Sequence, residues 1–372
     1  MRKITDVEII RYEPYTRTEE WGKTPIEHAF SKYPENGKIE RIYGQMGYCV
    51  IKITCDDGVY GYGSTGNYSV CGEIIDRAFR PLLIGQNPLE IEKLWDLMFS
   101  CSMPYGRRGA ALFAISAIDI ALWDILGKIA GLPVYQLLGG KVRDRIRCYG
   151  TGPYPEEHRK MKYIGTKIPM PYGPEHEKEG LRANEARVRE VREIVGEDME
   201  IMCDCWCGWD YMYTIKMAER LKQYNIKWIE EPLMPDDIEG YTRLRKVLNG
   251  MGIMLTTGEH EHTRWGAHEL IDNGCVDILQ VDVEYCGGVS ELKKIMGYAS
   301  VRGVYVVPHC PSVPGMHVVI NSTASPFMER ITTGVEPMFK TDFVEKDGYV
   351  ELSDTPGFGA ELNPNFAKIR DD

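Results

Sequence analysis

The stretch MEIMCDCWCGWDYMYTIKMAERLKQYNIKWIEE (199–231) decides the fold of this chain. Two short apolar segments, 199–204 and 227–230, flank a segment with helical periodicity at 211–224. A strand, a helix and a second strand in this order are typical of a βαβ unit, in which the two strands run parallel. The stretch therefore predicts part of a parallel sheet.

The same alternation continues on both sides of this stretch. Helical patterns at 184–196, 264–273 and 288–302 lie between further short apolar segments. Eight units of this kind favour a closed (β/α)8 barrel over an open sheet. The expected barrel strands are 146–151, 162–168, 199–204, 227–230, 253–259, 277–282, 304–309 and 326–329.

The residues before the barrel pattern predict a small α+β unit. Segments 4–12, 47–55 and 59–63 have the composition of strands, and Asp57-Gly58 between the last two is a hairpin turn signal. Residues 13–46 show little periodicity and are expected to form a long loop. Helical patterns follow at 71–83, 88–99 and 109–131, and the residues after the barrel, 331–372, are expected to be rich in loops.

Composition narrows the range of partners. The chain has 372 residues, with 44 basic and 55 acidic side chains and a formal net charge of −11. A surface this acidic argues against nucleic acid or an anionic membrane as the main partner. We expect neither a membrane span of roughly 18–20 apolar residues nor a signal peptide. The 11 cysteines are an odd number and lie in apolar segments, so we expect reduced thiols in a cytoplasmic protein.

Acidic residues stand at the ends of three consecutive predicted strands, as Asp204, Glu230 and Glu259. In a barrel of this kind the carboxyl ends of the strands meet at one mouth, where active sites form. Three carboxylates there would repel one another unless a cation neutralised them. All-oxygen ligands select a hard ion, so the sequence predicts a Mg²⁺ site on these three residues.

The sixth and seventh predicted strands end in Asp282 and His309. A carboxylate beside an imidazole fixes the tautomer of the ring and supports its protonated form, as in catalytic triads. The pair therefore predicts a catalytic acid/base. Glu329 on the eighth strand is a further catalytic candidate, with an ion pair to Arg330 or another base as the alternative.

Two other patterns are typical of zinc sites. Cys203, Cys205 and Cys207 alternate along one predicted strand. Spacing of two places them on one face, where we expect packing rather than a thiolate metal site. His260 and His262 resemble the histidine pair of barrel zinc hydrolases, although in those enzymes the pair belongs on the first strand.

The order Asp, Glu, Glu, Asp and His on successive strands resembles the enolase superfamily, mandelate racemase subgroup. Longer strings are similar to those of the L-rhamnonate dehydratases, and the likeness covers most of the chain beyond about residue 110. These strings are AIDIALWDILGKIAGLPVYQLLGG (117–140), KIPMPYGP (167–174), KWIEEPLMPDDIEGY (227–241), LTTGEHEHTRWG (255–266), DILQVDVEYCGGVSEL (277–292), VVPHCPS (306–312) and PGFGAELNP (356–364).

The resemblance implies an α+β capping domain (1–140), a (β/α) barrel (141–330) and a C-terminal segment (331–372) that returns to pack on the cap. It implies a Mg²⁺-dependent hydro-lyase that converts a sugar acid, L-rhamnonate or a related aldonate, to the 2-keto-3-deoxy acid. His309, oriented by Asp282, would be the acid/base, and His260 and Glu329 would contact the substrate. The resemblance also suggests a symmetric homo-oligomer such as an octamer.

Lys167, near the end of the second predicted strand, leaves a second activity open. Racemases of this subgroup place a lysine base there, on the face opposite the histidine, so Lys167 and His309 would suit an epimerase or racemase of a 2-hydroxy acid. The alternative for Lys167 is pairing with a carboxylate or a surface position. Two other classes of function stay open: a zinc hydrolase using His260, His262, His309 and an aspartate, and a non-catalytic binding protein.

Two regions that would shape the substrate pocket depart from the family pattern. Cys310-Pro311-Ser312 stands where the L-rhamnonate dehydratases have Gly-Ser-Ser, and the loop 13–46 matches them poorly. His28 and Arg41 in this loop are candidates for contact with the sugar acid, and Arg is suited to bidentate binding of a carboxylate. The particular sugar therefore stays open at this point.

Overall fold

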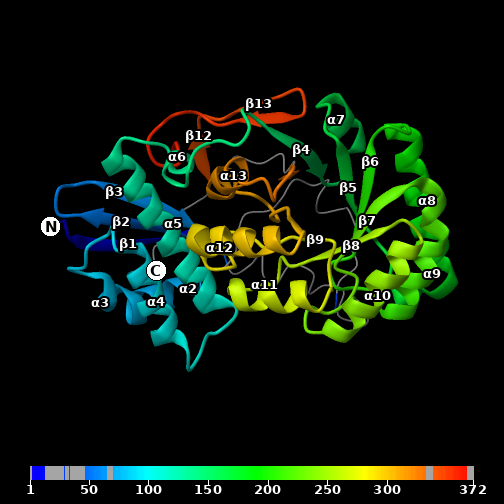
Figure 1. Cartoon of the computed structure of the whole chain (residues 1–372), viewed down its shortest axis with the longest axis horizontal. Coiled ribbons are helices and arrows are strands. Elements are labelled where there is room, and N and C mark those ends of the chain that lie inside the picture. Colours follow the sequence, from blue (N-terminus) through cyan, green and yellow to red (C-terminus); the bar gives the residue numbers. More distant parts are fainter. Residues whose placement is uncertain are drawn as a thin grey trace.

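The computed structural model describes residues 2–12, 29, 33, 47–64, 70–331 and 338–366. Its barrel strands are β4 (Ile146–Thr151), β5 (Gly165–Pro169), β6 (Glu200–Asp204), β7 (Ile226–Glu230), β8 (Met254–Thr257), β9 (Ile278–Leu279), β10 (Tyr305–Val306) and β11 (Met328–Ile331). Strands β4 to β10 pair in parallel in chain order, and β11 pairs in parallel with β4. Between β10 and β11, the Val306 N–H donates to the carbonyl of Ala324 at 3.0 Å. The expected (β/α)8 class is confirmed (Figure 1).

Helix α9 (Tyr211–Leu221) illustrates why the connecting segments are helical. The Asp210 carboxylate caps its N-terminus by accepting the N–H of Tyr213 at 2.7 Å. Tyr213, Met217 and Leu221 repeat every fourth residue and are buried on one face. The other helices of the barrel are α7 (Pro155–Lys160), η4 (Pro174–His176), α8 (Glu177–Val195), η5 (Lys222–Tyr224), α10 (Ile238–Gly250), α11 (Thr263–Asp272), α12 (Gly288–Val301) and α13 (Val313–Ile320).

The N-terminal residues form a separate antiparallel sheet of β1 (Ile4–Tyr12), β2 (Tyr48–Cys55) and β3 (Tyr60–Ser64), with β2 in the centre. Helix α5 (Ala110–Ala130) packs directly on β3, because a Cβ atom at Gly63 would lie 1.9 Å from the carbonyl oxygen of Ala117. The segment 71–83, expected as one helix, contains a π-helical turn in its middle. The remaining helices here are α2 (Cys71–Ile74), η3 (Ile75–Phe79), α3 (Arg80–Leu83), α4 (Ile91–Ser102) and α6 (Val134–Leu137).

Helix α5 is also long and apolar enough to cross a membrane by length and composition alone. The expectation that no segment reaches that length was therefore wrong. However, 83% of the most apolar 18-residue window of α5 is buried inside the protein. Its apolar character is that of a core helix, covered by β3 on one side and by α4 and α12 on others.

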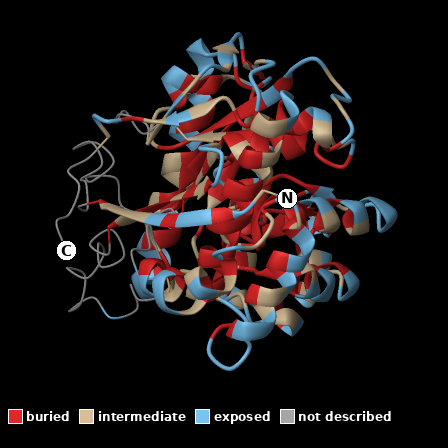
Figure 2. Cartoon of the chain, turned by 90° about the vertical axis from the view of Figure 1, so that its left-hand side faces the viewer, coloured by how far each residue is buried: buried red, intermediate tan, exposed pale blue. Residues whose placement is uncertain are grey.

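Polar contacts join the N-terminal unit to the barrel. The indole N–H of Trp95 in α4 donates to the carbonyl of Gly287 at 2.8 Å, just before α12. Both carboxylate oxygens of Asp119 in α5 accept hydrogen bonds from Ser290 of α12. Figure 2 shows the buried residues as a continuous interior beneath exposed outer helices and loops. The two units are therefore held in a defined relation to each other.

The C-terminal residues span both units (Figure 1). Strand β14 (Tyr349–Glu351) pairs with β13 (Val344–Lys346) and, antiparallel, with β4 of the barrel. Strand β12 (Phe339–Thr341) pairs with β15 (Ala360–Leu362). Between them, the Phe358 N–H donates to the carboxylate of Asp124 in α5 at 3.1 Å. The region expected to be rich in loops thus contains four short strands within its described residues.

Candidate active site

Acidic side chains converge on the ammonium group of Lys167 at the carboxyl ends of the barrel strands. The Lys167 Nζ atom lies 2.9 Å from Glu329 Oε1 and 3.3 Å from Asp204 Oδ2, and it also donates to Glu230. These side chains come from β5, β6, β7 and β11, and Lys167 is only 1% exposed. The parallel barrel explains the convergence, because the carboxyl ends of its strands face one mouth.

A carboxylate–imidazole pair lies on the other side of the mouth. His309 Nδ1 is 2.8 Å from Asp282 Oδ2, and His309 Nε2 is 3.5 Å from Glu259 Oε2. The other oxygen of Asp282 accepts the backbone N–H of Glu284 at 2.7 Å. Burial lowers the pKa of His309, but the charge of Glu259 and the hydrogen bond with Asp282 outweigh it and raise that pKa to about 10.

The donor set fits a hard divalent cation. Asp204, Glu230 and Glu259 offer only oxygen atoms, which suit Mg²⁺. Burial raises the pKa of all three carboxyls, for Glu230 to about 8, because the charged forms lose water. Among the described residues, their oxygens are not all within 4.8 Å of one another, and the Lys167 ammonium lies between Asp204 and Glu230. A bound cation would supply the charge that these carboxylates need.

The environment of Lys167 distinguishes between its two predicted roles. Burial alone would lower its pKa, but Glu230, Glu329 and Asp204 together raise the pKa well above its ordinary value. The three N–H bonds of an ammonium group match the three carboxylate contacts of Lys167. The geometry therefore fits the carboxylate-pairing alternative.

Glu329 forms an ion pair with a base other than Arg330. Its Oε1 atom contacts Lys167 and accepts from Thr151 of β4, and its Oε2 accepts the Cys310 N–H at 2.7 Å. The structure thus shows the ion pair that was the alternative for Glu329, with Lys167 as the base, while Arg330 pairs with Glu345 at 2.8 Å on the outside of the strand. Residues 329 and 330 point to opposite faces of β11, as the pleat of a strand requires.

Glu231 is a buried residue of this mouth that sequence reasoning missed. Its Oε2 atom is 2.9 Å from His260 Nδ1, and its Oε1 accepts the hydroxyl of Thr257 at 3.1 Å. The doublet Glu230-Glu231 was the available signal. The backbone at Glu231 has φ of 44°, which turns its side chain away from the direction that strand alternation would give.

The two zinc-type histidines have different partners in the structure, and that of His260 is Glu231. His262 Nε2 accepts the N–H of Gly109 at 3.1 Å, at the start of α5, and burial lowers the His262 pKa to about 4. The expectation for the three cysteines is also partly wrong. Cys203 and Cys205 pack in the barrel core, whereas β6 ends at Asp204 and Cys207 has a left-handed φ of 60°. His28 and Arg41 lie outside the described residues.

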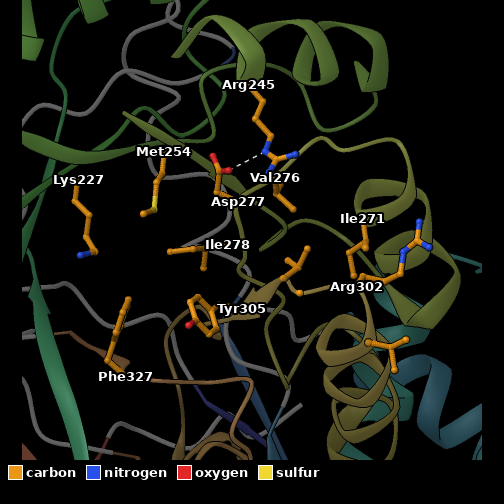
Figure 3. A pocket seen from close by; sticks show the side chains of 13 residues that line it. Lys227, Arg245, Met254, Ile271, Val276, Asp277, Ile278, Arg302, Tyr305 and Phe327 are labelled. Atoms are coloured by element: carbon orange, nitrogen blue, oxygen red, sulfur yellow. Dashed lines mark hydrogen bonds and ion pairs between the residues drawn. The ribbon is translucent and has the colours of Figure 1, made fainter. Parts of the chain in front are cut away.

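A cavity of about 630 Å³ lies at the opposite end of the barrel (Figure 3). Its lining comes from residues at the starts of strands, such as Lys227, Met254 and Tyr305. The Arg245 guanidinium in it is paired with Asp277 at 2.8 Å. This pocket therefore does not include the carboxylate cluster.

Comparison with known proteins places this geometry in context. Residues 39–139 match the family described as mandelate racemase / muconate lactonizing enzyme, N-terminal domain, and residues 156–366 match enolase C-terminal domain-like. The chain is 40% identical over 355 residues to L-rhamnonate dehydratase from Saccharopolyspora erythraea, covering 92% of this chain and 91% of the relative.

Solved structures give the same picture. A rhamnonate dehydratase from Gibberella zeae complexed with Mg superimposes with a TM-score of 0.92 at 32% identity, over 98% of this chain and 95% of that one. A 3,6-anhydro-D-galactonate cycloisomerase from Zobellia galactanivorans superimposes with a TM-score of 0.82 at 30% identity, over 98% and 99% of the two chains.

Proposed function

Because this chain belongs to the enolase superfamily, with the two domains of mandelate racemase and muconate lactonizing enzyme, we propose that it dehydrates L-rhamnonate or a closely related aldonate. The protein is a Mg²⁺-dependent sugar-acid dehydratase, a carbon–oxygen lyase. The observation that carries the choice of substrate is the 40% identity to an L-rhamnonate dehydratase over nearly the full length of both chains. The product would be the corresponding 2-keto-3-deoxy acid.

Asp204, Glu230 and Glu259 are the residues that would hold the Mg²⁺ ion. The ion would supply positive charge that stabilises the negative charge formed when the sugar acid loses its C2 proton. Trp228 and Gln280 orient Glu230, because their N–H groups donate to Glu230 Oε2 at 2.9 and 2.8 Å. Such supporting hydrogen bonds fix the direction of a metal-binding carboxylate.

His309 would move the protons. Its Nδ1 atom is held by Asp282, so Nε2 is the nitrogen directed to the mouth and to the proton on C2 of the sugar acid. After taking that proton, the imidazolium is an acid that can donate to the hydroxyl leaving from C3. One histidine thus serves both steps, and the pairing with Asp282 stabilises its charged form between them.

Racemisation would need a second base opposite His309. Lys167 is the candidate, but its Nζ atom is buried and contacts three carboxylates. A single base that also serves as an acid suits elimination of water. This supports dehydration over the epimerase alternative.

The test is to assay six-carbon and five-carbon aldonates with Mg²⁺ for release of 2-keto acid. We expect L-rhamnonate to give the highest kcat/KM and His309→Asn to abolish release. Deuterium exchange at C2 of recovered substrate, without 2-keto acid, would instead indicate an epimerase. Normal turnover by His309→Asn would exclude it as the base.

Location and assembly belong to the same proposal. We propose a cytoplasmic protein, since all 11 cysteines are thiols and nine of them are buried. We also propose a symmetric homo-oligomer. Exposed apolar side chains around the pocket of Figure 3 support this, namely Val301, Tyr305 and Met254 at 83%, 51% and 39% exposure. Light scattering on the purified protein measures its mass directly.

A further inference from the structure

A second group of metal-ligating side chains lies beside the proposed magnesium ligands. Cys207, Glu231 and His260 follow β6, β7 and β8, and one ligand atom from each lies within 4.8 Å of the other two. Glu231 Oε2 is 2.9 Å from His260 Nδ1 and 3.6 Å from Cys207 Sγ. Within the described part of the chain, no other three histidine, cysteine or acidic side chains meet as closely.

We propose that Cys207, Glu231 and His260 form a zinc site separate from the magnesium ligands. Sulfur, nitrogen and oxygen donors are the set that zinc takes in proteins, and tetrahedral coordination separates such donor atoms by about 3.3–3.6 Å. The two separations given above lie close to this range. A thiolate also selects zinc over Mg²⁺, so the two ions would sort between the two sites by ligand chemistry.

The backbone holds the three ligands in place. The Cys207 N–H donates to the carbonyl of Glu231 at 2.6 Å, and the Trp209 N–H donates to the carbonyl of Pro232 at 3.0 Å. Thr257 occupies Glu231 Oε1, which leaves Oε2 for the metal. These hydrogen bonds hold the segments after β6 and β7 together and orient the Glu231 carboxylate. Less conformational entropy is therefore lost when the ion binds.

The proposed zinc site is accessible from solvent at His260 and leaves one coordination position of the ion open. Cys207 and Glu231 are buried, whereas the His260 side chain is 38% exposed. Three protein ligands leave the fourth position for water or another small ligand, as in zinc sites that exchange ligands. The ion would therefore enter from the mouth of the barrel.

Zinc at this site would act on the substrate pocket. His260 Nε2 is 3.8 Å from Glu259 Oε1, and zinc on Nδ1 would replace the hydrogen bond between His260 and Glu231. If His260 contacts the sugar acid, zinc on Nδ1 fixes the orientation of the imidazole ring. The ring can then no longer turn to bind the sugar acid, and turnover falls. This consequence rests on the proposed function, whereas zinc binding itself does not.

The test uses the full-length protein in excess Mg²⁺, dialysed against Zn²⁺ and analysed for metal content. We expect one more zinc per chain in the native protein than in Cys207→Ser, with affinity weakened roughly 100-fold or more by the substitution. Co²⁺ in place of zinc should give a thiolate-to-cobalt charge-transfer band that Cys207→Ser lacks. Cys101→Ser, which removes an exposed thiol away from the cluster, should behave like the native protein.

Two results would overturn the site: equal zinc content in the native protein and Cys207→Ser, or no thiolate band in the native protein. His260→Asn serves as the second variant, since it removes a different ligand and should also lose the extra zinc. Circular dichroism checks that both variants are folded. Zinc binding through Cys207 in a protein that releases no 2-keto acid from any aldonate would overturn the proposed function and leave the zinc site standing.

Discussion

Replacing Asp282 by Asn should remove the base without removing the histidine. In the native protein, one oxygen of Asp282 accepts the Glu284 N–H at 2.7 Å and the other faces His309 Nδ1 at 2.8 Å. Asn has one oxygen and one NH₂ group. Its oxygen must face the Glu284 N–H, because two N–H groups cannot face each other in a buried site. The NH₂ group then faces His309 Nδ1.

That arrangement forces the wrong tautomer on His309. Nδ1 becomes the acceptor, so the proton of the neutral ring moves to Nε2, which is the atom that should receive the C2 proton. The equivalent change in a serine-protease triad lowers kcat about 10⁴-fold, so we expect a loss of about 10³–10⁴-fold here, or about 4–5.5 kcal/mol of transition-state stabilisation.

The assay is 2-keto acid release from L-rhamnonate at saturating Mg²⁺, with Mg²⁺ affinity measured separately by calorimetry. Asp282→Asn should keep its Mg²⁺ affinity and its KM within a few-fold and lose kcat. Asp277→Asn is the matched control, because Asp277 pairs with Arg245 at the far end of the barrel and should keep kcat. A kcat for Asp282→Asn within tenfold of native would refute the tautomer argument.

Three further predictions concern stability. Lys167→Met removes the cation from two buried carboxylates, Glu230 and Glu329, and from the half-buried Asp204. Thermal unfolding in EDTA should therefore show a loss of about 3–5 kcal/mol that saturating Mg²⁺ largely restores, and an equal loss in both conditions would contradict this. Gly63→Ala should cost about 1–3 kcal/mol in urea unfolding, because its Cβ meets Ala117, whereas Gly250→Ala, with open space around it, should cost nothing. Burial lowers the pKa of His317 to about 3, whereas the pKa of histidine in the unfolded chain is about 6.5. The neutral His317 therefore contributes fully to stability above about pH 6.5, and this contribution is lost as the pH falls below about 6.5. Between pH 7 and 5 the native protein should lose about 2 kcal/mol more than His317→Asn, and parallel pH profiles would count against this.

The barrel and the places of its acidic residues could be predicted because both follow from local patterns. Alternating strands and helices predict parallel strands, and parallel strands bring Asp204, Glu230 and Glu259 to one mouth whatever the details of packing. The contacts of Lys167 could not be predicted in this way. They depend on the register of β5 against β6, where Lys167 stands opposite Met202, and on the direction of a long side chain.

Other features were missed because they depart from regular structure. Strands β9 and β10 have two residues each, so Asp282 and His309 lie beyond the ladder rather than within strands of six residues. Left-handed backbone at Cys207 breaks the alternation from which its direction was inferred, and Glu231, which was missed, has left-handed backbone as well. Non-glycine residues adopt this conformation at a cost, and such positions are common at functional sites. Several of the errors thus lie around the barrel mouth.

The loop after β9 links the acid/base pair to the N-terminal unit. Asp282 binds His309, while Glu284, two residues on, accepts the hydroxyl of Ser64 in β3 at 2.8 Å. The backbone N–H of the same Glu284 fixes Asp282. A displacement of β3 would therefore act through Glu284 on the carboxylate that orients the base. Through these hydrogen bonds, the cap helps to hold the residue that orients His309.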